Sequence, residues 1–274
     1  MKSNYTQLLA IIIALGMVLF TGCDSTDSTP EMGTLEVRMH DAPAEFDEVN
    51  IFVERVEVNP SQNENSGWQV LSEPQQAYNL LELVNGAYEV LGSAELEAGT
   101  YEQIRLIIGQ EGTNIVVNGE QKALFVPSGA QTGVKLNVNA EISEGITYVL
   151  LLDFDADRSV VDSQQGQGYL LQPVIRATNE AITGNIGGSV NVDATLRAIL
   201  NAGTAEADTV STTISDEETG EFLLVGLEEN SYTVTVEPRV DGYTGTEFDN
   251  VEVTVGDTTD LGAIELESDE ESDE

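Results

Sequence analysis

The chain has 274 residues, of which 49 are Asp or Glu and 10 are Lys or Arg, giving a formal net charge of -39. This charge excludes ordinary nucleic-acid binding, because contacts with phosphates need a basic surface. Hydrophobic residues make up 41% of the sequence and recur in regular patterns, which excludes a wholly disordered chain.

The first 22 residues have the layout of a secretory signal peptide. A short polar segment with Lys2 precedes an apolar stretch from Leu8 to Phe20, and the small residues Thr21 and Gly22 follow. The apolar stretch is shorter than the roughly 20 residues that span a bilayer. We therefore favour a cleaved signal peptide over a retained transmembrane helix.

Cys23, the only cysteine, follows this segment directly. The stretch "LFTGC" resembles the lipobox of bacterial lipoproteins, which implies cleavage before Cys23 and a lipid on its sulfur. Phe20 stands where that motif most often has Leu. A single cysteine cannot form an internal disulfide, and lipid attachment would remove a reactive thiol. The alternative is an ordinary cleaved signal followed by an incidental cysteine.

Residues 23–32 contain no apolar periodicity and are predicted to form a flexible tether. The expected location is the cell envelope, where lipidated Cys23 would hold the protein on a membrane. We favour the outer membrane over the inner one, and the periplasmic or surface face stays open.

The excess of acidic residues also predicts the ionic strength at which the protein works. Lys122 and Lys135 are the only lysines left once the signal is removed. Acid excess with few lysines resembles proteins of extreme halophiles. Carboxylate repulsion destabilises a folded chain at low ionic strength, whereas at molar salt the Debye length is only about 3 Å. We predict adaptation to high salt, with loading of the carboxylates by divalent cations as the alternative.

Alternation of apolar and polar residues predicts an all-β fold, with short antiparallel strands in a β-sandwich over residues 33–178. The phase of the alternation slips once, which predicts a β-bulge near Glu54–Arg55. Asn118–Gly119 predicts a type I′ hairpin turn. Residues 79–92 fit a short helix as well as a strand, and they are the only helix candidate after the signal.

Six segments of this region carry a family resemblance when taken in order. They are "GTLEVRMHDAP", "VNIFVERVEVNP", "GTYEQIRLIIG", "VPSGAQTGVKLN", "LLDFDADRSVV" and "GYLLQPVIRA". Together they resemble a bacterial envelope family, domain-of-unknown-function family 4382, over residues 33–178. The resemblance implies a lipoprotein module joined to other β modules, and it implies no catalytic residue.

A change of composition around residues 177–188 indicates a domain junction, and residues 182–266 predict a second antiparallel β-sandwich. The segments "ISDEETGEFLLVGLEENSYTVTVEPRVDGY" and "VEVTVGDTTDLGAIEL" resemble the carboxypeptidase regulatory-like domain. That resemblance implies a transthyretin-like sandwich of seven strands with an accessory role. Residues 267–274 are predicted to form a disordered acidic tail.

Within the second region, Gly220 is expected at a hairpin turn. Four apolar side chains are expected to pack in the core, namely those of Phe222, Leu227, Tyr232 and Val234. Asn230–Ser231 departs from the family pattern, because most members have a glycine before the tyrosine.

Asp153, Asp155 and Asp157 form the sharpest candidate site. They recur at every second residue, so an extended chain would place them on one face. Three such carboxylates repel unless they are solvated or bridged, and hard oxygen ligands suit Ca²⁺. The sequence is not an EF-hand, because Arg158 stands where that loop needs Gly. We predict a calcium site, with a solvated acidic strand end and a local Arg158 pair as the alternative.

His40 and Trp68 are the other residues considered for chemistry. His40 is the only histidine and is expected on a surface or sheet edge rather than in a catalytic triad, since no serine lies in a nucleophile-elbow pattern. Zinc sites of Cys and His type are excluded by composition. Trp68, the only tryptophan, alternates with Val70, and this spacing favours a place in the core over a sugar-binding platform.

These features predict a lipid-anchored envelope protein with a structural or ligand-binding role, without enzymatic activity and without an obligate cofactor. The expected partners are the membrane and an envelope protein or glycan. The alternative from another class is a glycan-binding or glycan-processing accessory lipoprotein. A hydrolase is a third alternative and would need a pocket with a perturbed pair of carboxyl groups.

Overall fold

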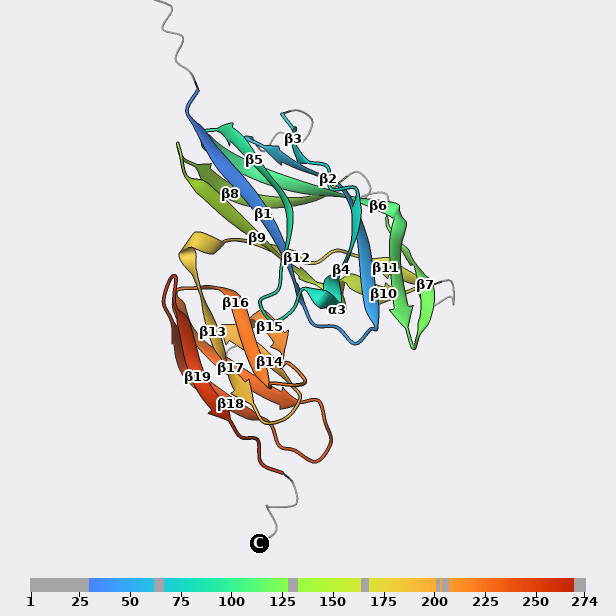
Figure 1. Cartoon of the computed structure of the whole chain (residues 1–274), viewed down its shortest axis with the longest axis vertical. Coiled ribbons are helices and arrows are strands. Elements are labelled where there is room, and N and C mark those ends of the chain that lie inside the picture. Colours follow the sequence, from blue (N-terminus) through green and yellow to red (C-terminus); the bar gives the residue numbers. More distant parts are fainter. Residues whose placement is uncertain are drawn as a thin grey trace, which may run out of the picture. The chain divides into compact units, whose positions relative to one another are not determined.

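Strands make up almost every element of the computed structural model (Figure 1). The structure describes residues 30–61, 67–127, 133–163, 168–200, 203 and 207–268. The predicted signal peptide, Cys23 and most of the tether lie outside these residues, as does nearly all of the predicted tail. The chain divides after Pro30 into two units, and all the elements below belong to the unit 31–274.

A four-stranded sheet forms one layer of the N-terminal β-region, residues 31–179. Its strand order is β12–β9–β1–β5. The strands span Ile175–Asn179, Thr147–Asp155, Met32–Ala42 and Glu89–Glu97, respectively. β1 runs antiparallel to β5 but parallel to β9. The parallel pair is a local departure from the predicted antiparallel arrangement, and it is possible because β5 and most of the other sheet lie between β1 and β9 in the sequence.

The second layer of this region is an eight-stranded sheet of order β10–β11–β7–β6–β2–β3, with β4 paired to β2 and β8 paired to β6. In this sheet β11 and β7 are parallel. The strands are β2 (Glu48–Asn59), β3 (Gln69–Ser72), β4 (Gln76–Asn79), β6 (Gly99–Val117), β7 (Glu120–Phe125), β8 (Val134–Ile142), β10 (Val160–Asp162) and β11 (Tyr169–Leu171).

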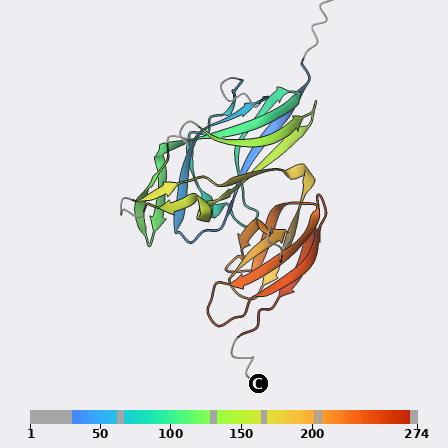
Figure 2. The ribbon, with the colours of Figure 1, turned by 180° about the vertical axis from the view of Figure 1, so that it is seen from behind.

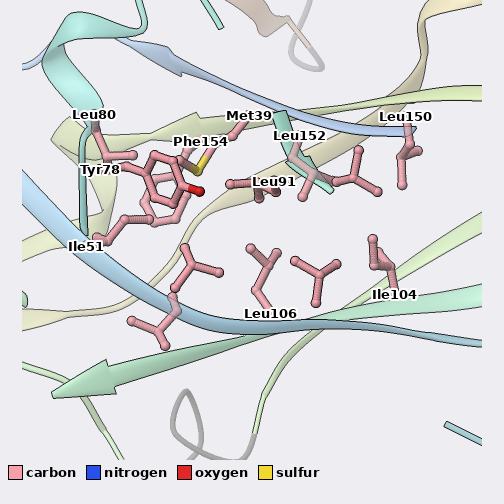
Figure 3. Close-up of a cluster of buried hydrophobic side chains, with 14 of the residues drawn as sticks. Met39, Ile51, Tyr78, Leu80, Leu91, Ile104, Leu106, Leu150, Leu152 and Phe154 are labelled. Carbon is pink, nitrogen blue, oxygen red and sulfur yellow. The ribbon is translucent and has the colours of Figure 1, made fainter. Parts of the chain in front are cut away.

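The core of this region lies between the inner faces of the two sheets. Alternate residues of each strand point inward, as the period-two pattern predicts. Figure 3 shows Met39 of β1 and Leu152 of β9 facing Ile104 and Leu106 of β6, and all four side chains are buried. Burying one such side chain stabilises the fold by roughly 1.5–3 kcal/mol. This packing confirms the predicted all-β sandwich fold.

Two local predictions in this region are confirmed. The pairing of β2 with β6 shifts register between Val53 and Arg55, at the predicted bulge, so Val56 still points into the core. Asn118 and Gly119 both have positive φ, 53° and 73°, and they join β6 to β7 as a type I′ turn requires.

The predicted helix at residues 79–92 is reduced to one turn of 3-10 helix, η1 (Leu80–Glu82). The Asn79 side chain caps this turn by accepting a hydrogen bond from the Leu81 N–H at 3.3 Å. From Glu89 the chain belongs to β5, because pairing with β1 satisfies its backbone and buries Leu91. The short helix α3 (Ala156–Ser159) and the 3-10 turn η2 (Glu180–Ile182) were not predicted.

The C-terminal β-region, residues 183–268, has two sheets and its own hydrophobic core, and its strands form a gold-to-red group in Figures 1 and 2. One sheet has the order β16–β13–β19 and the other β15–β14–β17–β18. β13 and β19 are parallel, which again departs from the antiparallel prediction. The strands are β13 (Thr183–Val190), β14 (Ala194–Leu200), β15 (Asp208–Ile214), β16 (Glu221–Glu228), β17 (Asn230–Pro238), β18 (Thr246–Val253) and β19 (Thr258–Ile264).

Gly220 occupies the turn position that its sequence context predicts. Its φ is +71°, and a Cβ there would lie 2.2 Å from the backbone oxygen of Val190, so a larger residue would be strained and would clash. The four residues predicted for the core are all buried, namely Phe222, Leu227, Tyr232 and Val234. The predicted turn at Gly220 and the packing of these four residues are therefore confirmed, but the turn joins β15 to β16, which belong to different sheets, so the predicted hairpin is wrong.

Candidate ligand-binding site

A row of three polar residues crosses the four-stranded sheet of the N-terminal region. His40 of β1 is in register with Asp153 of β9, which is in register with Arg176 of β12. These side chains lie on the face opposite the core, because they alternate with Met39, Leu152 and Ala177. The distances are 3.4 Å from His40 Nδ1 to Asp153 Oδ1 and 3.4 Å from Arg176 to Asp153 Oδ2.

His40 is buried, with only 2% of its surface exposed, so its predicted place on a surface or sheet edge is wrong. The reason is that β1 has neighbours on both sides, and residues of the C-terminal region cover its outer face. A carboxylate can only accept hydrogen bonds, so the ring tautomer that bonds to Asp153 is the one with its proton on Nδ1. Nε2 is then an acceptor, and it is buried without a hydrogen-bond partner among the described residues.

Asp41 is fully buried beside this row, a feature that the sequence prediction missed. Its Oδ1 accepts a hydrogen bond of 3.0 Å from the Ala156 N–H, while Oδ2 has no partner among the described residues. Burial raises the pKa of this carboxyl well above its usual value, the bond from Ala156 lowers it, and the charges of Asp153 and Asp155 raise it further. Asp41 is thus protonated more readily than an exposed aspartate.

The three aspartates of the predicted calcium site have different surroundings. The strand ends at Asp155, which caps α3 by accepting a hydrogen bond of 2.9 Å from the Arg158 N–H. Asp157 lies inside that helical turn, so the assumption of one extended face is wrong. Burial raises the pKa of Asp155. Among the described residues, no group of three or more His, Cys, Asp or Glu side chains is arranged to hold a metal ion. Calcium binding by these aspartates stays a prediction.

Arg158 pairs locally with Asp155 at 3.7 Å, as the alternative to calcium binding supposed. A cleft of about 950 Å³ opens beside this pair. Its lining includes all three aspartates, from the N-terminal region, and Arg197 and Arg239, from the C-terminal region. The structure therefore gathers carboxylates and guanidinium groups that are far apart in sequence around one polar cleft.

Asn85 connects the two β-regions through three hydrogen bonds. Its N–H donates to Thr213 Oγ1 at 3.1 Å, its side-chain amide donates to the Glu221 carbonyl at 3.2 Å, and its Oδ1 accepts from the Leu223 N–H at 2.5 Å. Asn85 has a left-handed φ of 56°, which Asn tolerates better than most residues. Arg176 adds a bond of 3.2 Å to the Gly226 carbonyl. These contacts were not predicted, because no local pattern marks them.

We expect Asn85→Ala to lower the free energy of unfolding by about 1–2 kcal/mol, because it loses both side-chain hydrogen bonds and disfavours the left-handed φ. Urea denaturation followed by tryptophan fluorescence measures this change. The matched control is Asn250→Ala, which replaces an exposed asparagine of similar φ, 56°. If both variants lose the same free energy of unfolding, the loss comes from the left-handed backbone conformation and not from the side-chain hydrogen bonds of Asn85.

Trp68 does not lie in the core, so that part of the prediction is wrong. It is half-buried, and the guanidinium of Arg105 stacks on its ring at 4.1 Å from the ring centroid. Val70, with which it alternates, is 54% exposed. Arg105 in turn pairs with the buried Glu57, which also accepts from Arg55 at 2.6 Å. The Trp68 ring therefore has a cationic neighbour on its face.

The fold and site define an all-β sandwich protein with buried polar groups on the outer face of one sheet. The chain belongs to the family described as Domain of unknown function (DUF4382), whose model matches residues 32–173, more than half of the sequence. This confirms the resemblance seen in the six sequence segments. None of the curated proteins matches.

Three solved structures illustrate the similarities found. The TIE protein of Bacillus anthracis is 15% identical with a TM-score of 0.24, and the match covers 87% of this chain but only 34% of that one. The minor pilin GBS52 of Streptococcus agalactiae is 12% identical with a TM-score of 0.21, over 85% of this chain and 95% of that one.

The third similar structure is the D295N mutant of the shaft pilin SpaA from Lactobacillus rhamnosus GG. It is 10% identical with a TM-score of 0.20, over 86% of this chain and 97% of that one. Among the residues that the structure describes, no helix has the length and apolar character needed to cross a membrane.

Proposed function

We propose that this protein is a lipid-anchored, non-enzymatic component of a bacterial cell envelope, with a structural or ligand-binding role and adaptation to high salt. The observation that carries the proposal is the position of Cys23. The only cysteine directly follows a signal-like segment and precedes a short polar stretch, and β1 begins at Met32. A multi-chain lipid anchor there would hold the folded β-regions close to a membrane surface.

The organisation of the chain after β1 supports a binding or structural role. The N-terminal region belongs to the family of unknown function, and the described residues of the C-terminal region form seven strands in two sheets, an arrangement compatible with the carboxypeptidase regulatory-like resemblance. We propose that the C-terminal region is an accessory module of that kind. Clefts and pockets where such modules meet are common ligand sites.

Metabolic labelling tests the anchor. In a bacterium grown with radioactive palmitate, the wild-type protein is expected to carry label and to partition with the membrane fraction. Cys23→Ser is expected to lose the label entirely, because no other cysteine is present. Gel autoradiography of the immunoprecipitated protein measures both results.

A matched control tests whether labelling requires a cysteine at position 23 or only a thiol near it. The double variant Cys23→Ser with Ser25→Cys restores one cysteine two residues away from the lipobox-like sequence. It is expected to stay unlabelled. A wild-type protein without label, or a labelled Cys23→Ser variant, would contradict the proposed anchor.

A further inference from the structure

A pocket of about 270 Å³ lies against the outer face of the four-stranded sheet, next to His40. Leu151 of β9 lines one side, and Leu223 and Val225 of β16 line the other. The ring of Tyr88 is also part of the wall, and the guanidinium of Arg38 stacks on that ring at 4.5 Å from its centroid. These side chains give the pocket apolar walls.

Polar groups border the same pocket. His40, Glu180, Thr183 and Asn185 are among its lining residues. Glu180 accepts two hydrogen bonds from Arg38, at 2.8 and 3.0 Å, so its charge is already compensated. Small ligand sites in proteins typically combine apolar walls with a few converging polar groups in this way.

One nitrogen of His40 lacks a hydrogen-bond partner. Its Nδ1 faces Asp153, whereas its buried Nε2 has no hydrogen-bond partner among the described residues. A buried acceptor without a partner is unfavourable, because its lost hydration is not replaced by a hydrogen bond. A hydroxyl group that entered from the pocket and donated to Nε2 would recover part of that cost.

We propose that this pocket binds a small molecule with an apolar ring and a hydroxyl group, the ring against Tyr88, Leu151, Leu223 and Val225 and the hydroxyl donating to His40 Nε2. The volume is just below the range of about 300–1,000 Å³ usual for ligand pockets, so the ligand is small. This inference rests on the ligand-binding part of the proposed function and is independent of the lipid anchor.

Phenol is a suitable probe, because it combines an aromatic ring with one hydroxyl donor. Anisole is the matched control, since its methyl ether keeps the ring and removes the donor. His40 is the only histidine, so the imidazole nitrogen signals of histidine-labelled full-length protein report on this pocket alone. Phenol is expected to shift the Nε2 signal saturably, with a Kd of about 1 mM, and to bind about fivefold more tightly than anisole.

Two variants test the location by the same titration. Val225→Phe fills the pocket and is expected to abolish the phenol-induced shift, whereas Val240→Phe, at an exposed position outside it, is expected to leave the shift unchanged. Equal affinities for phenol and anisole, or no saturable shift in the wild type, would overturn the proposal. The wild-type comparison of the two probes decides the matter even if Val225→Phe does not fold. Loss of palmitate labelling would leave these results unaffected.

Discussion

The melting temperature of the protein is expected to rise by about 10 °C or more between 0.1 M and 3 M NaCl, corresponding to roughly 3–5 kcal/mol. The chain has 49 acidic and 10 basic residues, so most carboxylates cannot find a cation within the protein. Each of its seven arginines already pairs with a carboxylate, and these are Arg38, Arg55, Arg105, Arg158, Arg176, Arg197 and Arg239. Salt is expected to screen the remaining repulsion.

The physical reason is the range of the repulsion. At 0.1 M salt the Debye length is about 10 Å, so carboxylates on neighbouring strands repel one another, whereas at 1 M it is about 3 Å and only contacting charges interact. Unfolding separates the charges, so repulsion penalises the folded state more strongly. Differential scanning calorimetry over a series of NaCl concentrations measures the shift.

Two controls identify screening as the cause. Sucrose is excluded from protein surfaces but does not screen charges, so it is expected to give a much smaller rise at equal osmolality. A variant with five exposed glutamates changed to Gln is expected to melt higher at 0.1 M NaCl and to respond less to salt; these are Glu217, Glu218, Glu229, Glu247 and Glu252. A wild-type melting temperature that stays constant or falls with salt would refute the proposed adaptation.

Features fixed by neighbours in the chain could be predicted from the sequence. The period-two pattern of β1 and β9 indicates which side chains are buried, and the slip after Val53 locates the bulge, because both depend on a few adjacent residues. The turn at Asn118–Gly119 is local in the same sense. Strand order is different: the parallel pairing of β1 with β9 joins segments about a hundred residues apart, and no short pattern encodes it.

The candidate site depends on that pairing and was therefore mostly missed. His40, Asp153 and Arg176 come together only because β1, β9 and β12 are adjacent and in register. The sequence pattern identified Asp153 as notable, but it assigned the residue to an extended acidic face rather than to a row with a histidine and an arginine. The run of consecutive buried residues at the end of β1 is a property of the folded sheet and is not visible in the alternation.

Asp41→Asn is expected to stabilise the protein by about 2 kcal/mol at pH 7, a gain that should disappear near pH 3. Asn keeps an oxygen that can accept from the Ala156 N–H, now at 3.0 Å from Oδ1, but it removes a charge from a fully buried position. Burial and the nearby Asp153 and Asp155 raise the pKa of Asp41 in the folded state. The folded protein therefore keeps this proton to higher pH than the unfolded chain does.

The direction of the pH dependence follows from this difference. Below about pH 3.9 the aspartate is protonated in both states, and its burial costs little. As the pH rises above that value the unfolded chain releases the proton first, so the wild-type free energy of unfolding falls until the folded-state pKa is passed. The Asp41→Asn variant has no carboxyl group at this position, so its free energy of unfolding does not show this fall with pH. Urea denaturation of both proteins between pH 3 and pH 8, in 2 M NaCl to screen the other carboxylates, measures the difference.

Asp41→Ala separates the buried charge from the hydrogen bond. Like Asn it removes the charge, but it leaves the Ala156 N–H without its acceptor and creates a small cavity. We expect this variant to be about 1–3 kcal/mol less stable than Asp41→Asn at every pH. If Asp41→Asn is less stable than the wild type at pH 7 but equal to it at pH 3, the ionised carboxylate stabilises the fold, and the pKa of Asp41 must then be lowered rather than raised. The pH profile of this one buried carboxyl thus reports directly on the electrostatics next to the His40 row.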